Sequence, residues 1–246
     1  MTAELPATAP LAVVAGASGA IGLAVTERLH TAGWAVIGTY RSNRPELRTG
    51  VTWVYFDGSR ACGTGVLRAA LAASTRPLRA VICCIGAPSS KRRVADTDPD
   101  EFDAVYTANI TSVVRLWHTV CASARQSSAG VVLLGSDTTT TLRPGNGAYS
   151  AAKAGLEALS ATLAAEEAEH GVRVNLVAPS LVDSPLAETV LALKGVSNPT
   201  DYYPTLPWGR PLTTSEVAAV AVEIATAPHW RYASGQAVRL TARGNR

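Results

Sequence analysis

Tyr149 and Lys153 are two residues whose types and spacing could perform acid–base chemistry. They stand four positions apart in Tyr149-Ser-Ala-Ala-Lys153, and residues i and i+4 lie on one face of a helix. A free tyrosine has a pKa near ~10, so it exchanges protons poorly at neutral pH. A nearby ammonium favours the phenolate. We therefore expect Lys153 to lower the pKa of Tyr149 and make it a general acid/base.

Ser136 strengthens this interpretation, because a Tyr-x-x-x-Lys spacing alone arises by chance in many helices. Ser136 stands thirteen residues before Tyr149, at the end of the apolar run 131–135. Each residue also has a purely structural interpretation: a strand-end cap for Ser136, a half-buried aromatic for Tyr149 and a solvated helix position for Lys153. Asp137, the next residue, could contact substrate or form a turn.

A glycine-rich turn offers a second kind of chemistry. It follows the expected strand 11–16 and opens an expected helix at 20–32. Glycines permit a tight turn and let backbone N–H groups approach a pyrophosphate at a helix N-terminus. In this context the G-x-x-G-x-x-G spacing predicts dinucleotide binding. The residues expected to hold the cofactor here are Gly16, Ser18, Gly19, Ala20, Ile21 and Gly22.

The residues after the second expected strand favour NADP(H) over NAD(H). An acidic residue there would hold the ribose 2′-OH, whereas an arginine accommodates a 2′-phosphate. The sequence reads Tyr40-Arg41-Ser42-Asn43-Arg44, and no acidic residue occurs before Glu46. Arg41 offers a planar guanidinium, and Ser42 a hydrogen-bond donor, to that phosphate. The alternative is that Arg41 and Arg44 are solvated loop charges.

Short apolar runs alternate with helical patterns along the chain. The expected strands are 11–16, 34–40, 51–56, 78–85, 130–136, 172–178 and 235–241, and the expected helices are 20–32, 61–75, 99–125, 147–169 and 214–227. This alternation predicts a parallel sheet covered by helices on both faces. The fold class is therefore α/β, a single-domain Rossmann fold with a doubly wound parallel sheet of about seven strands flanked by helices. Residues 1–9 are expected to form a flexible N-terminal tail, and 10–246 the single NADP-binding catalytic domain.

Residues 183–212 interrupt the alternation with five prolines and the side chains Tyr202, Tyr203, Leu206 and Trp208. We expect a long irregular insertion that serves as a substrate loop or lid, with a plain surface excursion as the alternative. A basic run, Lys91-Arg92-Arg93, follows the fourth expected strand. It could steer an anionic substrate or a carrier protein, or be a solvated loop.

Composition limits the classes of function. The 246 residues are 47% hydrophobic and 17% charged, which is typical of a soluble globular domain. Neither nucleic-acid binding nor a membrane span is expected, because the net charge is only +3 and the apolar runs are short. The cysteines Cys62, Cys83, Cys84 and Cys121 form no C-x-x-C pair, so no metal site is expected. Their number and the absence of an apparent signal peptide indicate a reducing cytoplasm.

These pieces together resemble the short-chain dehydrogenase/reductase family, from about residue 11 to 241. Asp57 matches the family's aspartate beside the adenine, and Asn109 stands 27 residues before Ser136, as in the family's catalytic tetrad. The stretches 173–179 and 234–236 also match. One departure is Cys83-Cys84-Ile85-Gly86 in place of Asn-Asn-Ala-Gly, which must reorganise the bracing of that backbone.

The resemblance implies a catalytic tetrad and further cofactor contacts. Tyr149 would protonate the carbonyl oxygen and Ser136 would donate to it. Lys153 would tune Tyr149 and bind the nicotinamide ribose, while Asn109 would hold a water that resupplies the proton. The remaining implied cofactor-binding residues are Asp57, Gly86, Tyr149, Lys153, Pro179, Val182 and Ser184.

The expected function is an NADP(H)-dependent ketoreductase that interconverts a carbonyl and an alcohol. The aromatic residues of 183–212 favour an apolar or aromatic small-molecule substrate. Together with the arginine-rich, alanine-rich composition, they favour a role in polyketide or other secondary-metabolite, including antibiotic, biosynthesis. The alternatives are a 3-oxoacyl carrier-protein reductase, a sugar or alcohol dehydrogenase, and a non-catalytic NADP(H)-binding regulator. The family resemblance also implies a homo-oligomer, a tetramer or dimer.

Overall fold

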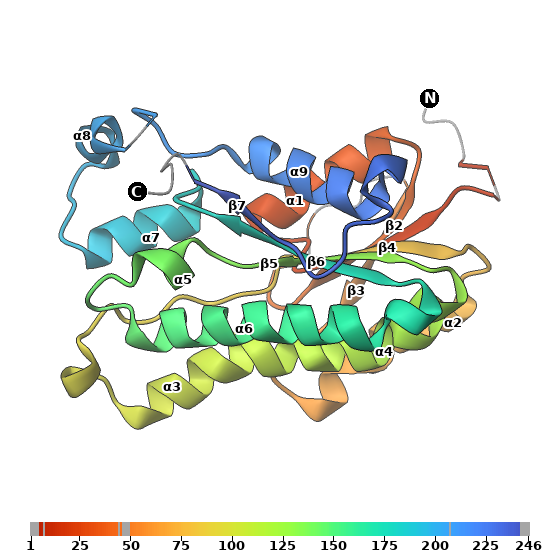
Figure 1. The fold of residues 1–246 in the computed structure, drawn as a ribbon, viewed down its shortest axis with the longest axis horizontal. Coiled ribbons are helices and arrows are strands. Elements are labelled where there is room, and N and C mark those ends of the chain that lie inside the picture. The colour runs from red at the N-terminus through yellow and green to blue at the C-terminus, as the bar shows by residue number, and fades with distance from the viewer. Residues whose placement is uncertain (1–4, 7, 44, 46–49, 207, 242–246) are drawn as a thin grey trace.

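A computed structural model describes residues 5–6, 8–43, 45, 50–206 and 208–241 of the chain. The positions Arg44, Glu46 and Pro207, part of the expected tail and the end of the expected domain lie outside these described residues. Within them the chain folds into three layers, with a central sheet between two layers of helices (Figure 1).

Seven parallel strands form the sheet, which confirms the α/β doubly wound fold. The strand order is β3-β2-β1-β4-β5-β6-β7. The strands are β1 (Leu11–Ala15), β2 (Ala35–Tyr40), β3 (Val51–Tyr55), β4 (Leu78–Cys83), β5 (Gly130–Leu134), β6 (Arg173–Pro179) and β7 (Ala237–Leu240). Every residue of β1 and of β5 is buried, because helices cover both faces of the sheet. The order reverses between β1 and β4, where ligands of such sheets bind at the carboxyl ends of the strands.

The two helical layers use different parts of the chain. On one face lie α1 (Ala20–Thr31) and α9 (Thr214–Thr226), and on the other lie α2 (Gly65–Ala73), α4 (Ser112–Gln126) and α6 (Gly147–Glu166) (Figure 1). Each layer has its own apolar cluster, with Val25 and Val217 on the first face and Leu116 and Leu156 on the second. This burial is the main favourable term that fixes the helices on the sheet.

The single helix expected at 99–125 is instead two helices with a wider turn between them. α3 (Pro99–Tyr106) leads into a π-helical turn, Thr107–Thr111, before α4 begins. Ser112 donates a side-chain hydrogen bond of 2.9 Å to the Thr107 carbonyl, five residues earlier. Apolar periodicity cannot distinguish this turn from an α-helix, and π-helical turns are frequent at functional sites.

The sequence predicted an irregular segment at 183–212, but the structure has helices there. It contains α7 (Pro185–Leu193), α8 (Pro199–Tyr202) and a 3₁₀ turn, Tyr203–Thr205. Pro185 and Pro199 occupy the first turns of their helices, where a missing N–H costs nothing, and Ser184 caps α7 by accepting from Ala187 N at 3.3 Å. The prolines therefore begin helices here rather than prevent them.

The N-terminal residues that the structure describes are held against the domain rather than loose. The Arg76 guanidinium donates to the carbonyl oxygens of Leu5 and Ala9, each at 3.3 Å, and Ala9 is buried. Among the described residues no helix has both the length and the apolar character needed to span a bilayer.

Candidate active site

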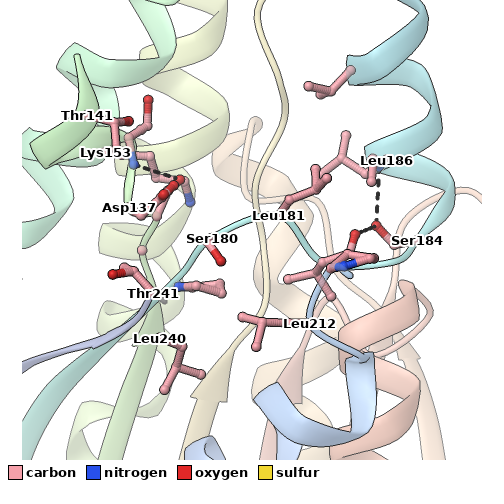
Figure 2. Close-up of a pocket in the computed structure, with 18 of the residues that line it drawn as sticks. Asp137, Thr141, Lys153, Ser180, Leu181, Ser184, Leu186, Leu212, Leu240 and Thr241 are labelled. Carbon is pink, nitrogen blue, oxygen red and sulfur yellow. Dashed lines mark hydrogen bonds between the residues drawn. The ribbon is translucent and has the colours of Figure 1, made fainter. Parts of the chain in front are cut away.

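A cleft of about 1370 Å³ opens at the carboxyl ends of the strands, between two walls (Figure 2). The α6 wall consists of Ser136, Asp137, Asn146, Tyr149 and Lys153, which follow β5 or belong to the start of α6. The α7 wall consists of Ser184, Leu186, Val190, Lys194, Tyr202, Leu206 and Trp208. Figure 2 shows Asp137 and Lys153 on one side of the cleft and Ser184 and Leu186 on the other.

Tyr149 and Lys153 share one face of α6, as their spacing predicts. The Lys153 ammonium lies 5.7 Å from the centre of the Tyr149 ring. It donates a hydrogen bond of 2.9 Å to the Leu134 carbonyl at the end of β5 and is only 3% exposed. Because a strand and a helix both hold it, the ammonium has one well-defined position in the cleft.

The pKa of Tyr149 differs from our expectation. Burial raises it to about 12, the contact with the Ser136 hydroxyl lowers it in part, and the charge of Asp137 raises it again. Burial also lowers the pKa of Lys153 to about 8, because the apolar surroundings disfavour its charge. The expectation of a lowered tyrosine pKa was wrong for this structure, because burial disfavours the phenolate and is the largest cause of the shift. Tyr149 is therefore a protonated donor at neutral pH.

Ser136 belongs to a hydrogen-bonded network at the entrance to α6. Its hydroxyl accepts from Thr138 N at 3.3 Å. The Thr138 hydroxyl bonds Ser150 at 3.0 Å and accepts from Asn146 Nδ2 at 2.6 Å. The Asp137 backbone carbonyl accepts from Thr140 N at 3.0 Å, which starts the short helix α5 (Thr138–Thr141). Asp137 therefore forms a turn while its side chain also lines the cleft.

Asn109 lies behind the α6 wall, in the π-helical turn, and is fully buried. Its amide Nδ2 donates to the carbonyls of Ala87 at 3.0 Å and Val105 at 2.9 Å, whereas its buried Oδ1 has no partner in the described part of the chain. A Cβ placed on Gly86 would lie 3.1 Å from that oxygen and 3.2 Å from the Lys153 ammonium. Gly86 thus keeps open a polar space between the two groups, which suits a water molecule.

The glycine turn has the geometry that phosphate binding needs. Gly16 has a φ of 74°, and its N–H donates to the Thr39 hydroxyl at 2.9 Å. A Cβ on Gly22 would lie 2.2 Å from the Gly16 carbonyl oxygen, so only glycine fits where α1 packs under the turn. Gly19 is exposed and immediately precedes α1. The free N–H groups at the start of a helix attract an anion. These residues fit a dinucleotide, and Ile21 continues from the turn into the cleft.

Arg41, Ser42 and Asp57 lie beyond the cleft, at the ends of β2 and β3. Arg41 and Ser42 are exposed. The Asp57 carboxylate accepts from Ser59, at 3.0 Å from its N–H and 2.6 Å from its hydroxyl. The side-chain bond to Ser59 is the main cause that lowers the pKa of Asp57, and the charge of Arg41 adds to it. Arg41 and Asp57 are therefore near neighbours.

The remaining expected cofactor-binding residues line the cleft, and one of them, Ser184, also caps α7. Gly86, Pro179, Val182 and Ser184 all line the cleft. The Ser184 hydroxyl donates to the Val182 carbonyl at 3.1 Å while it caps α7. Where the family has amides, Cys84 lines the cleft and stays a thiol, because burial raises its pKa.

Sequence reasoning missed several residues that line the cleft and misplaced others. The missed residues on the α7 wall are Leu186, Val190 and Lys194. An irregular loop was expected at 183–212, so there was no reason to place these side chains in the cleft. Tyr203 does not line the described cleft but donates to Asp183 at 3.3 Å. The basic run divides: Lys91 lines the cleft, whereas Arg92 and Arg93 are exposed and do not line it.

Known proteins resemble this chain in sequence and in fold. A family model described as enoyl-(acyl carrier protein) reductase, of the short-chain alcohol dehydrogenase type, matches residues 15–240. The chain belongs to the short-chain dehydrogenase/reductase family. Proteins of this family are oxidoreductases that bind a nicotinamide cofactor and act on carbonyl or alcohol groups of small molecules.

Relatives in this family include several reductases. The chain is 28% identical over 243 residues to the short-chain reductase protein NovJ of Streptomyces niveus, covering 94% of this chain and 92% of that protein. It is 30% identical over 224 residues to an acetoacetyl-CoA reductase of Shinella zoogloeoides, covering 88% and 90%. The fold matches that of actinorhodin polyketide ketoreductase with NADPH, with a TM-score of 0.88, 23% identity and coverage of 97% and 98%.

The described residues contain no group of three or more His, Cys, Asp or Glu side chains that could hold a metal ion. The geometry brings the acid–base groups of the α6 wall together on one cleft.

Proposed function

We propose that this chain is an NADP(H)-dependent ketoreductase that interconverts a carbonyl and an alcohol. The observation that carries the proposal is the convergence of Ser136, Tyr149 and Lys153 on one cleft, beside a glycine turn that fits a dinucleotide. The relatives named as reductases support the same reaction type.

Tyr149 and Ser136 act on the substrate oxygen in this proposal. Bound NADPH supplies the hydride. The Tyr149 phenol, protonated at neutral pH because burial raises its pKa to about 12, donates its proton to the carbonyl oxygen. The Ser136 hydroxyl donates a hydrogen bond to the same oxygen, and this bond strengthens as negative charge develops there. The Lys153 ammonium stabilises the phenolate that remains.

Asn109 completes the route by which the proton returns. The space beside Gly86 lies between the unpartnered Asn109 Oδ1 and the Lys153 ammonium. A water in this space would accept from Lys153 and donate to Asn109, which connects the phenol with solvent. The test is a solvent isotope effect on NADPH oxidation, expected to increase in Asn109→Ala because proton resupply becomes slower. An unchanged isotope effect and rate would contradict this role.

Arg41 and Ser42 select NADP(H) in this proposal. Both are exposed at the end of β2, and Arg41 is close enough to Asp57 to influence its pKa. We expect Arg41→Ala to weaken NADPH binding by about 10-fold or more, because it loses a charge-assisted contact with the 2′-phosphate. NADH affinity is the matched control and should not change. Tighter binding of NADH than NADPH by the wild type would contradict the preference.

The substrate is an apolar or aromatic ketone, as in tailoring of polyketides or similar secondary metabolites. Leu186, Tyr202, Leu206 and Trp208 supply apolar surface on the α7 wall. The relationship to NovJ of Streptomyces niveus supports a reductase of this kind. NADPH oxidation measured with ketones from small acyl thioesters to fused aromatic polyketides tests the proposal. Turnover of small thioesters alone would favour a 3-oxoacyl reductase instead.

The protein also works as a homo-oligomer in this proposal, which rests on the family resemblance. Analytical ultracentrifugation should give a dimer or tetramer at micromolar concentration. A monomer of 25.5 kDa would contradict it.

A further inference from the structure

Lysine is rare in this chain, and its placement is uneven. The sequence holds three lysines among 22 lysine and arginine residues, and all three line the cleft. Lys153 belongs to the proposed acid–base machinery. Lys91 and Lys194 have no part in it, although both line the same cleft.

Lys91 is fixed by its backbone and by its neighbours. Its φ of 66° lies in the left-handed region, which residues with a side chain adopt only when the surroundings enforce it. A Cβ on Gly145 would lie 2.5 Å from the Lys91 carbonyl oxygen, so the two backbones pass in close contact. The Lys91 ammonium donates to Asn146 Oδ1 and lies 5.3 Å from the centre of the Tyr149 ring. This half-buried ammonium is therefore held directly beside the proposed acid.

Lys194 brings a second ammonium from the α7 wall. It ends α7 and is exposed at the edge of the cleft. Lys91 and Lys194 line the same cleft. Burial lowers the pKa of Lys91, and the charge of Lys194 lowers it further. Two ammonium groups in one cleft repel each other. A bound anion that contacts both lysines would offset this repulsion, because it attracts each ammonium group.

Other charged side chains of the cleft do not neutralise this pair. In the described part of the chain, the ion pairs that involve cleft residues join Arg210 to Glu216 and Arg239 to Glu157, each at 2.6 Å, and neither includes the two lysines. Asp137 is a further carboxylate on the cleft, and Arg143 a further cation. Cations therefore outnumber carboxylates along the cleft.

Building on the proposed reductase function, we propose that Lys91 and Lys194 bind a carboxylate of the carbonyl substrate. The preferred substrates are then aromatic ketones that also carry a carboxylate, rather than the same ketones without one. Because Lys91 stands over the Tyr149 ring, the carboxylate binds in the same part of the cleft as the carbonyl that Tyr149 protonates. Charge-assisted hydrogen bonds from both ammonium groups would orient the substrate as well as bind it.

Matched acid and ester substrates test the proposal. The pairs are 4-acetylbenzoate with its methyl ester and benzoylformate with its methyl ester, each reduced with NADPH. The measured quantity is the ratio of kcat/KM for acid to that for ester, which cancels general damage near Tyr149. We expect Lys91→Met and Lys194→Met each to lower this ratio about 10-fold, the value of one charge-assisted hydrogen bond. Arg92→Met, a neighbouring exposed cation outside the cleft, should leave the ratio unchanged.

Two results would overturn the proposal. One is a wild-type ratio of one or less for both pairs, and the other is a ratio that neither lysine substitution lowers. Lys194→Met removes an exposed side chain, so it remains informative if Lys91→Met does not fold. Reduction of the esters with no preference for the acids would refute the carboxylate site alone and leave the reductase function intact.

A binding measurement keeps the test independent of turnover. Calorimetry with NADP⁺ present compares 4-ethylbenzoate with the neutral 4-ethylbenzamide. We expect the wild type to bind the carboxylate about 10-fold more tightly, and Lys91→Met or Lys194→Met to lose that preference. Equal affinities in the wild type would overturn the proposal even if no ketone were reduced. A fall in NADP⁺ affinity without loss of the preference would assign the lysines to the cofactor instead, and would also overturn it.

Discussion

The two walls of the cleft are built differently. On the α6 wall, Lys153 is 3% exposed and bonded to the end of β5, and Ser136 belongs to a hydrogen-bonded network. On the α7 wall, Trp208 is 75% exposed and Leu186 is also exposed. The first wall comes from a central strand and a long helix packed on the sheet, whereas the second comes from short helices at the edge of the molecule (Figure 1).

The α7 wall is nevertheless anchored where it leaves and rejoins the sheet. Val182 and Leu212 form an isolated parallel bridge, and Asp183 N donates to the Leu212 carbonyl at 2.7 Å. The Arg210–Glu216 ion pair adds a third contact next to that point. Acid–base chemistry needs atoms fixed to a fraction of an ångström, while a recognition surface tolerates movement between fixed ends. The comparison therefore assigns chemistry to the α6 wall and selectivity to the α7 wall.

The largest expected effect is on the α6 wall. Tyr149→Phe should lower kcat by about 10²–10⁴-fold, because it removes only the proton donor. Tyr202→Phe is the matched control, since it removes a phenol oxygen from the opposite wall and should change kcat less than 3-fold, roughly the loss of a neutral hydrogen bond. Steady-state NADPH oxidation and NADPH affinity are the measurements. Equal losses in both variants would break the comparison, and an unchanged kcat in Tyr149→Phe would show that Tyr149 is not the proton donor. NADPH binding without NADPH oxidation in the wild type would indicate a non-catalytic binding protein.

The burial of Lys153 predicts a pH-dependent stability of the protein without cofactor. Its pKa is about 8 in the folded state and near 10.5 when unfolded, so the unfolded state binds more protons between these values. Stability should therefore rise as pH increases from 8 to 10.5. Lys153→Met should exceed the wild type at pH 7 by up to about 3 kcal/mol and lose that advantage by pH 10.5.

Urea unfolding at pH 7 and at pH 10.5 measures this difference. A less stable Lys153→Met at both pH values would show that the bond to the Leu134 carbonyl outweighs desolvation.

Gly86→Ala should disturb the space behind the α6 wall. The new methyl would lie 3.1 Å from Asn109 Oδ1 and 3.2 Å from the Lys153 ammonium, closer than ordinary contact. We expect kcat to fall about 10-fold, the equivalent of one displaced hydrogen-bonded water, with little change in melting temperature. Gly65→Ala, where a Cβ meets nothing within 4 Å, is the control. An unchanged kcat would mean that this space takes no part in proton transfer.

The smallest expected effect is on the α7 wall. Trp208→Ala should raise KM for a bulky aromatic ketone about 3-fold and leave kcat unchanged, because a mostly exposed side chain offers limited apolar contact. KM for a small aliphatic ketone should stay the same. A fall in kcat of the size expected for Tyr149→Phe would place chemistry on both walls.

Local features of the site could be predicted from the sequence. The turn at 16–22 depends on glycines within a few residues of one another, and Gly22 meets the carbonyl of Gly16. The shared face of Tyr149 and Lys153 follows from the helical repeat alone. The seven strands and their parallel arrangement follow from the alternation of apolar runs with helical patterns. Such features are encoded by neighbours in sequence, so the order of residues determines them.

Only the tertiary structure determined the pKa values in the site and the residues that face each other across the cleft. The pKa of Tyr149 rises rather than falls because the folded chain buries the phenol. The π-helical turn at Asn109 and the start of α7 each contain a side-chain hydrogen bond that periodicity does not reveal. Lys91 and Lys194 are 103 positions apart, and only folding brings their charges into one cleft. Desolvation and Coulomb interactions depend on distance and burial in space, which the order of residues along the chain does not specify.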